Sequence, residues 1–232
     1  SLVLPANRST DTLLTRAVLD ITEKGRRQLW QKTVDAKCAN QYALAEYFQP
    51  GNEKLGAFYS CAMGQHPKKE ATSARYYWNL FGQTAGRGDF VRARDGGGLN
   101  SLLNFGYAIL LSLTLRNLFA VGLDPTFGVF HATRERATPL AYDLMEPFRP
   151  CVDVRVLGWV ESHSDPSEWT VSPEFKKWIV PLTEQKIVYQ GRKITMRACL
   201  ERTIRSFRAA VMDKKSTTYQ PWTLKNSKWA GC

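Results

Sequence analysis

A long apolar run at residues 99–123 constrains the fold of this 232-residue chain more than any other feature. The run is long enough to cross a membrane as a helix, but Asn100, Asn104 and Arg116 interrupt it. A helix that faces lipid would not carry these side chains together, because each would lose its hydration in the hydrocarbon layer. We therefore predict a buried helix over residues 99–120 in a globular protein, with no membrane association.

Further helices are indicated on the N-terminal side of this run. Apolar residues recur at helical spacing over residues 26–48, and Pro50 with Gly51 then ends that helix. A second helix is predicted over residues 67–81, which contain helix formers and no breaker. Residues 82–98 carry six glycines and three arginines, a composition that predicts a mobile loop.

The C-terminal half gives weaker signals. Thr138 followed by Pro139 predicts the N-cap and first residue of a helix that continues to residue 148. Residues 186–195 are compatible with a short hairpin around Gln190 and Gly191, and residues 196–215 with a basic helix. The predicted fold class is therefore mainly α, with any sheet confined to the extreme N-terminus or to residues 186–195.

Positive charge is concentrated at the C-terminal end of the chain. The whole sequence has 32 Lys and Arg against 21 Asp and Glu, a net charge of +11. Residues 1–175 hold 19 basic and 18 acidic side chains, net +1, whereas residues 176–232 hold 13 and 3, net +10. A localised basic block can line a phosphate backbone and release its counterions, so we expect a polyanionic partner.

The cysteines indicate a reducing compartment. All five are far apart, odd in number and without CxxC spacing, which argues against a zinc site or a redox motif. The N-terminus shows no signal-peptide pattern. We therefore expect reduced thiols and a cytoplasmic protein.

A few acidic residues and one histidine are candidates for a metal site. Asp143 and Glu146 lie three residues apart on a predicted helix, which places both carboxylates on one face, within reach of one ion. His131 follows an apolar run that should hold it near the core. Taken alone, such an acidic pair is more often a solvated helix face, such a histidine is more often structural, and Glu70 is simply a good helix former.

Four segments in a fixed order change this interpretation. They are Glu70 with "AR.YW" after it, then "GLNSLLNFGYAIL", then "GLDP..G.FH", then "LAYDLMEPFRP.VD". This series resembles the integrase of CRISPR adaptation, the first of the CRISPR-associated proteins. The resemblance extends from residue 26 to Asp153 and more loosely to the end of the chain.

The resemblance implies a catalytic metal held by Glu70, His131 and Glu146, with Asp143 beside them as a second acidic group. Carboxylates with one imidazole suit Mg²⁺ or Mn²⁺. Such an ion aligns an attacking oxygen with the phosphorus and neutralises the developing charge. In an integrase the attacking group is a DNA 3′-hydroxyl and the reaction is transesterification, whereas a hydrolytic nuclease with similar ligands would use water.

Arginines in three places are predicted to contact DNA: Arg75, Arg87, Arg92, Arg94, Arg202, Arg205 and Arg208. The first resembles the family's arginine after Glu70, and structural ion pairing is an equal alternative for it. The next three lie in the glycine-rich loop. The last three recur every third residue and are predicted to lie along one side of a helix. Solvated charge is the alternative for both groups, and Asn104 and Tyr107 are expected to serve in packing and hydrogen bonding.

The N-terminus departs from the family pattern. The resemblance implies a β-rich domain ahead of the helical catalytic domain, and we expect this domain to be largely missing here, either in a trimmed chain or in a naturally short variant. We interpret residues 1–20 as its remnant or a linker, and residues 21–232 as the helical metal-dependent domain with the basic segment 176–232. The implied partners are spacer duplex and CRISPR repeat DNA, a second copy of the chain in a homodimer or higher homo-oligomer, and a small ferredoxin-like second adaptation protein.

Other functions stay open at this point. A casposase-type transposase shares this catalytic domain and tends to append a helix-turn-helix module, for which residues 176–232 show no clear pattern. A noncatalytic DNA-binding scaffold is a further alternative. The retention of all four acidic and imidazole positions argues against the scaffold.

Overall fold

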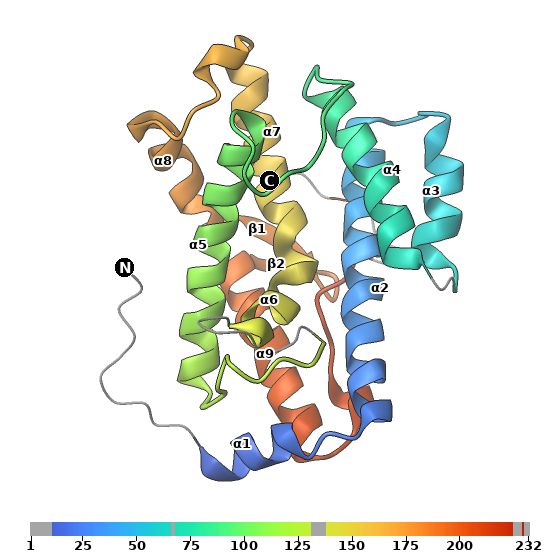
Figure 1. Cartoon of the computed structure of the whole chain (residues 1–232), viewed down its shortest axis with the longest axis vertical. Coiled ribbons are helices and arrows are strands. Elements are labelled where there is room, and N and C mark those ends of the chain that lie inside the picture. Colours follow the sequence, from blue (N-terminus) through green and yellow to red (C-terminus); the bar gives the residue numbers. More distant parts are fainter. Residues whose placement is uncertain (1–10, 66–67, 131–137, 225–228, 230–232) are drawn as a thin grey trace.

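Three helices, α2 (Glu23–Phe48), α5 (Leu99–Ala120) and α7 (Arg149–Ser162), run along the long axis of the molecule, and α7 packs against both of the others (Figure 1). The structure, a computed structural model, describes residues 11–65, 68–130, 138–224 and 229. The shorter elements are α1 (Thr12–Leu19), α3 (Lys54–Met63), α4 (Lys69–Thr84), α6 (Pro139–Met145), α8 (Pro173–Ile179), α9 (Met196–Met212) and the 3₁₀ turns η1 (Glu146–Phe148), η2 (Pro166–Glu168), η3 (Val180–Glu184) and η4 (Ser216–Thr218).

Helix α5 is the buried helix that the apolar run predicts. Its length and mean hydropathy would suffice to cross a membrane, but half of that stretch is buried inside the protein. It packs against α6, α7 and α9. Gly106 allows the approach of α7, because a Cβ added there would lie 2.4 Å from Cγ1 of Val152. The hydrophobicity of the run is therefore accounted for by packing within the fold.

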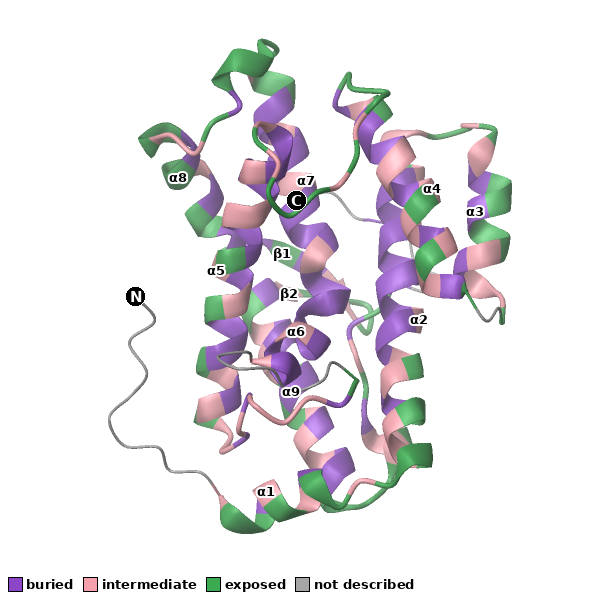
Figure 2. Ribbon diagram, in the orientation of Figure 1, coloured by how far each residue is buried: buried purple, intermediate pink, exposed green. Residues whose placement is uncertain are grey.

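Helix α2 is buried along its middle (Figure 2). The hydroxyl of Thr22 caps its first turn by accepting a hydrogen bond from the amide of Gly25 at 3.2 Å. Its buried residues include a polar row at helical spacing: Thr33, Lys37, Asn40 and Gln41. Burying polar groups without partners is costly, so this row requires partners from neighbouring elements.

Asn40 fastens α2 to two distant segments. Its Nδ2 donates to the carbonyl oxygens of Pro147 at 2.8 Å and Trp222 at 3.1 Å, and its Oδ1 accepts from the amide of Leu224 at 2.6 Å. The indole of Trp222 also stacks on Phe148, with ring centroids 5.3 Å apart. The segment that follows α9 is thereby held beside η1.

Helices α1, α3 and α7 are not anticipated by the sequence-based prediction. The Asp11 side chain caps α1 by accepting hydrogen bonds from two backbone amides, and Leu14 and Val18 are buried. Residues 12–19 are thus a helix packed on α9, and the interpretation of residues 1–20 as a remnant or linker stays a prediction. The proline at position 150 does not end the helical region, because proline is tolerated in the first turn of α7.

The glycine-rich segment begins later than predicted. Helix α4 continues through Gly82 to Thr84, and a Cβ at Gly82 would lie 2.5 Å from the carbonyl oxygen of Arg87. The glycine therefore permits the loop to fold back onto the helix. Residues 85–98 contain no helix or strand, as predicted. The side chain of Asn100 holds this loop by bonding to the backbone of Val91 and Ala93.

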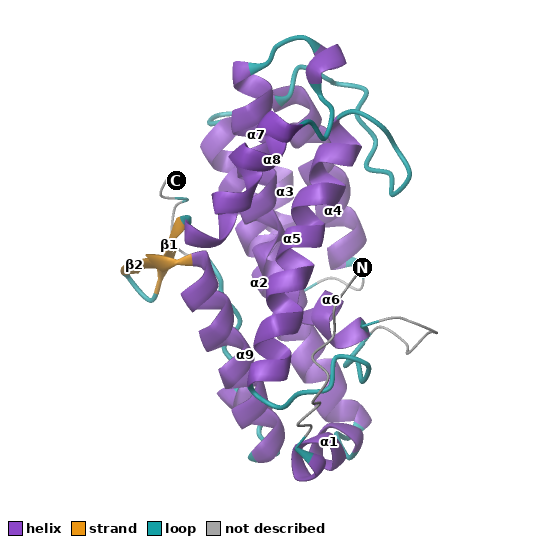
Figure 3. Ribbon diagram, turned by 90° about the vertical axis from the view of Figure 1, so that its left-hand side faces the viewer, coloured by secondary structure: helices purple, strands orange, loops and turns teal. Residues whose placement is uncertain are grey.

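A single antiparallel hairpin is the only sheet among the described residues. Strands β1 (Lys186–Tyr189) and β2 (Arg192–Thr195) pair with Ile187 opposite Ile194. The turn residues Gln190 and Gly191 have φ of +49° and +76°, as a two-residue turn of type I′ requires. Figure 3 shows the hairpin at the margin of an otherwise helical molecule. The mainly α fold class and the location of the hairpin are confirmed.

Candidate active site

Two of the predicted metal ligands come together from separate elements. Glu70 lies in the first turn of α4, and Glu146 opens η1, where the helical path from α6 tightens before α7. The Glu146 side chain is 6% exposed and the Glu70 side chain 38% exposed. One carboxylate is thus buried in the fold, and the other borders the solvent.

The side chain of Lys37 from α2 joins these two carboxylates. Its Nζ lies 2.8 Å from Oε1 of Glu70 and 2.8 Å from Oε2 of Glu146. Burial alone would lower the pKa of Lys37, but the carboxylates of Glu146 and Glu70 outweigh it and raise the pKa above its ordinary value. Lys37 is therefore a protonated, buried ammonium between the two acids. The sequence analysis did not identify it as a site residue.

A second cation accompanies the buried carboxylate. Nε of Arg149 lies 3.4 Å from Oε1 of Glu146, and the guanidinium lies over the ring of Tyr107 at 4.8 Å from its centroid. Both oxygens of Glu146 therefore face positive charge, which is what allows a carboxylate to stay ionised when it is buried.

Asp143 is a second buried carboxylate, and backbone amides bind one of its oxygens. It is 1% exposed, and its Oδ2 accepts hydrogen bonds from the backbone amides of Val129 at 2.7 Å and Phe130 at 3.0 Å. These bonds hold the end of the segment that leads to residue 131. Asp143 thus fixes the path of the chain toward the predicted histidine ligand.

The side chain of Phe130 also holds the segment that leads to residue 131. The ring of Phe130 stacks on that of Trp30 from α2, with centroids 4.3 Å apart and an interplanar angle of 1°. His131 itself lies outside the described residues, so its ligation stays a prediction.

A buried carboxylate of another kind lies on α7. Asp153 is 0% exposed, and its two oxygens accept hydrogen bonds from the hydroxyls of Tyr77 and Tyr107, each at 2.5 Å. Burial raises the pKa of Asp153 to about 6, although the two tyrosine hydrogen bonds act in the opposite direction. The arrangement ties α4 and α5 to α7. Tyr107 therefore serves in packing and hydrogen bonding, as predicted.

The described part of the site suits a hard divalent cation. Glu70 and Glu146 direct oxygens from different elements at one cationic atom, and carboxylate oxygens are the ligands that Mg²⁺ and Mn²⁺ prefer. Within the described ranges, no three His, Cys, Asp or Glu side chains form a complete ligand group. Two carboxylates are consistent with Mg²⁺, which usually retains several waters.

The loop arginines differ in their freedom to meet phosphate. Arg92 donates to Oδ1 of Asn100 at 2.8 Å and to Oδ1 of Asn104 at 2.6 Å, so it is committed to holding the loop on α5. Arg87 is exposed and pairs with Asp89 at 3.3 Å. Arg75 on α4 and Arg94 in the loop are also exposed. The structure thus leaves these three available to a ligand and anchors Arg92.

The three arginines of α9 do not form one straight row. A spacing of three residues falls short of a full turn, so each successive side chain is displaced around the helix by about 60°. Arg202 lies over the ring of Tyr189, and Arg205 pairs with Glu201 at 2.9 Å. Arg208 is half-buried and donates to the carbonyl oxygen of Val121 at 3.1 Å. The first two face solvent, whereas the third fastens α9 to the end of α5.

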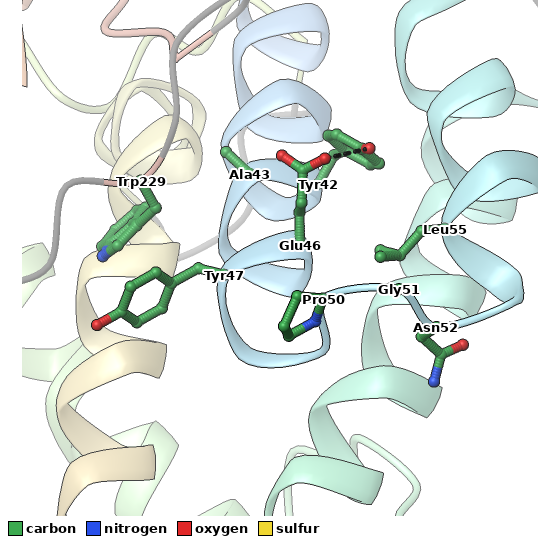
Figure 4. A pocket seen from close by; sticks show the side chains of 9 residues that line it. All are labelled: Tyr42, Ala43, Glu46, Tyr47, Pro50, Gly51, Asn52, Leu55 and Trp229. Atoms are coloured by element: carbon green, nitrogen blue, oxygen red, sulfur yellow. Dashed lines mark hydrogen bonds between the residues drawn. The ribbon is translucent and has the colours of Figure 1, made fainter.

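A surface pocket lies apart from the acidic site, where α2 ends and α3 begins (Figure 4). It is lined by Tyr42, Ala43, Glu46, Tyr47, Pro50, Gly51, Asn52, Leu55 and Trp229. The hydroxyl of Tyr42 donates to Oε1 of Glu46 at 2.9 Å. Glu46 is nine residues after Lys37, roughly 13 Å along the helix axis, so this pocket is not part of the candidate active site.

Comparison with known proteins identifies relatives of this sequence. A family model described as CRISPR associated protein Cas1 matches residues 1–179. A CRISPR-associated endonuclease Cas1 from Neisseria meningitidis is 30% identical over 204 residues, which cover 85% of this chain and 64% of that protein. One from Pyrobaculum aerophilum is 38% identical over 117 residues, 50% of this chain and 38% of that protein. The chain thus spans less than two thirds of the length of these relatives.

Solved structures share the fold. A casposase bound to its integration product is similar with a TM-score of 0.72 and 22% identity, over 90% of this chain and 72% of that one. A Cas1 protein from Thermotoga maritima is similar with a TM-score of 0.72 and 16% identity, over 89% of this chain and 73% of that one. At these identities the likeness establishes the fold alone.

Proposed function

The chain belongs to the Cas1 family of CRISPR-associated proteins, and on this basis we propose that it is the helical catalytic region of a metal-dependent DNA integrase. In this proposal it joins the 3′-hydroxyl ends of short spacer DNA to a CRISPR repeat by transesterification. The observation that carries the proposal is the convergence of Glu70 and Glu146 on one cationic atom, each at 2.8 Å.

The proposed metal is Mg²⁺ or Mn²⁺, held by Glu70, Glu146 and His131. When bound, such an ion neutralises charge that develops on the phosphate oxygens and polarises the attacking hydroxyl. The protein's own residues prepare the position. Arg149 sustains the charge of the buried Glu146, and Asp143 orders the backbone that leads to residue 131.

DNA is the proposed substrate, and the basic segment 176–232 is the proposed route to its backbone. The proposed protein partners are a second copy of this chain, in a homodimer or higher homo-oligomer, and a small ferredoxin-like second adaptation protein. A chain from a structure described as a Cas6–RT–Cas1–Cas2 complex is similar in fold, with a TM-score of 0.77 and 16% identity over 92% of this chain and 27% of that one, which is compatible with such partners. The proposed location is the cytoplasm, and the four described cysteines are free thiols.

A strand-transfer assay tests the proposed reaction. The protein, a short duplex with 3′-hydroxyl ends, supercoiled plasmid and Mn²⁺ should give nicked plasmid covalently joined to the duplex. The same duplex with dideoxy ends should give none. Replacing Glu70 or His131 by Ala, or adding EDTA, should abolish joining while DNA affinity stays nearly unchanged, because phosphate contacts dominate that affinity. Full activity in either variant or in EDTA would refute the metal site.

A salt series tests the proposed DNA contacts on α9. Each lost phosphate contact lowers the slope of log affinity against log salt by roughly 0.9 on duplex DNA. The double change Arg202→Gln and Arg205→Gln should lower the slope, since both side chains face solvent. Arg208→Gln is the matched control, because its guanidinium is engaged within the fold. An unchanged slope in the double variant would move the interface to Arg75 and the glycine-rich loop.

The strand-transfer assay also separates the integrase from two alternatives. Hydrolytic nuclease activity has support in the naming of the curated relatives as endonucleases, and it would yield cleaved fragments without joined product. Casposase-type transposition has support in the likeness of the fold to a casposase. It would show as joining that requires terminal inverted repeats on the donor and ignores the CRISPR repeat.

A further inference from the structure

The buried ammonium of Lys37 occupies the point at which the two proposed ligand carboxylates meet. We propose that Lys37 is an internal counter-cation: it holds Glu70 and Glu146 together in the metal-free protein and competes with the divalent ion, so that it sets the metal affinity of the site. This inference rests on the proposed function, because it presupposes that these carboxylates bind a metal.

The first step concerns the two carboxylates. Each has an oxygen 2.8 Å from Nζ of Lys37, so those two oxygens are no more than 5.6 Å apart. Like charges at this separation repel, and the burial of Glu146 strengthens the repulsion because little water screens it. Without a cation between them the two side chains would separate or one would take up a proton. Lys37 removes this repulsion before any metal arrives.

The second step concerns the charge balance around the position. The carboxylates of Glu70 and Glu146 are matched by the ammonium of Lys37 and the guanidinium of Arg149. A divalent ion that enters this neutral group meets a positive charge already in contact with both proposed ligands. Removing the charge of Lys37 therefore favours the ion, whether the ammonium stays in place or withdraws on binding.

The third step separates this role from ordinary structural support. Lys37 also ties α2 to α4 and to η1, as a structural lysine would. Loss of a purely structural tie would loosen the ligands and weaken metal binding. Loss of a competing cation would tighten metal binding and make the protein depend on the metal for its stability. The sign of the change in metal affinity thus distinguishes the two roles.

The experiment is a titration of the chain with Mn²⁺, followed by electron paramagnetic resonance, together with thermal melts with and without Mn²⁺. Lys37→Met keeps the length of the side chain and removes its charge. We expect its dissociation constant for Mn²⁺ to fall by at least about tenfold, because a unit charge next to a partly buried ion is removed. We also expect a lower melting temperature without Mn²⁺ and a larger increase in melting temperature on adding it.

Lys69 offers a matched control in the same region. It is also a buried lysine, 5% exposed, and its Nζ lies 2.6 Å from Oδ1 of Asp35, which is not a proposed ligand. Lys69→Met should lower stability without tightening Mn²⁺ binding. Equal tightening in both variants would overturn the inference, because it would reflect overall charge. Unchanged or weaker binding in Lys37→Met would overturn it as well.

A second variant keeps the test decisive if Lys37→Met does not fold without metal. Lys37→Gln retains hydrogen-bond donors and should show the same direction of change. Failure of both variants to fold even in Mn²⁺ would overturn the inference, which requires that a divalent ion can replace the ammonium. Glu70→Gln tests the proposed function separately. If Mn²⁺ binds equally well to it and to the unaltered chain, the metal site itself is wrong.

Discussion

Two carboxylates on the same helical path, Glu146 and Asp153, are buried in opposite ways. Glu146 faces the cationic groups of Lys37 and Arg149, whereas Asp153 accepts hydrogen bonds from the neutral hydroxyls of Tyr77 and Tyr107. Two cations contact Glu146 directly, whereas burial raises the pKa of Asp153 to about 6 even though the tyrosine hydrogen bonds and the charges of Arg149 and Arg92 lower it. A charged carboxylate is prepared to bind a cation, and a carboxylate between tyrosines is suited to joining helices.

The largest expected difference between the two acids is in strand-transfer activity after each is replaced by its isosteric amide. Glu146→Gln removes a proposed metal ligand. Loss of a residue that only hydrogen-bonds to a ligand costs up to about 100-fold in activity, so strand transfer should fall by more than about 100-fold here. Asp153→Asn keeps the shape of a side chain that does not contact the proposed metal position, so it should retain strand transfer when equal amounts of folded protein are compared. Rates measured at saturating Mn²⁺ check this. Equal losses in both variants would remove the distinction.

The pH dependence of stability should sharpen the comparison next. Between about pH 4 and 6 the folded protein retains a proton on Asp153 that the unfolded chain has released, so this residue makes stability fall as pH rises through that window. The contribution amounts to about 2–3 kcal/mol, given a shift of roughly two units. Urea melts across this pH range give the free energy of unfolding. It should fall with rising pH more steeply in the unaltered chain than in Asp153→Asn. Parallel curves would show that Asp153 is not the titrating group.

The smallest expected effect comes from single tyrosine hydroxyls. Tyr77→Phe leaves one oxygen of Asp153 without its donor, which should cost about 1–3 kcal/mol of unfolding free energy. Tyr107→Phe should cost a similar amount, since its hydroxyl lies at the same distance of 2.5 Å. Both should leave Mn²⁺ affinity unaltered. Unchanged denaturation midpoints, or a change in Mn²⁺ affinity, would contradict a purely structural role for this cluster.

Much of the fold follows from periodicity. The apolar run of α5, the amphipathic pattern of α2 and the Gln190–Gly191 turn are local signals, and the structure contains each of them. Helices α1 and α3 are short, and α7 has a proline in its first turn. These helices depend more on packing in the finished fold than on local sequence pattern.

The site could be predicted only in part. Glu70 and Glu146 are implied by the family resemblance and do converge. The described partners of Asp143 include backbone amides, which no side-chain pattern in the sequence predicts. Lys37 was missed because a lysine on a helix is usually solvated. The sequence did contain one signal. Lys37 lies in a row of polar residues at helical spacing beside the apolar face of α2, and such a row indicates a helix that is buried on two sides.

The Asn40 side chain has a consequence for the modularity of this protein. The family match ends at residue 179, yet Asn40 binds the backbone of Trp222 and Leu224 on one side and Pro147 on the other. The segment that the family model matches is therefore shorter than the unit that folds. A chain that ends at residue 179 would keep the matched residues but lose the C-terminal segment that packs on the core. A truncated variant should therefore retain the segment that Asn40 binds, through Leu224.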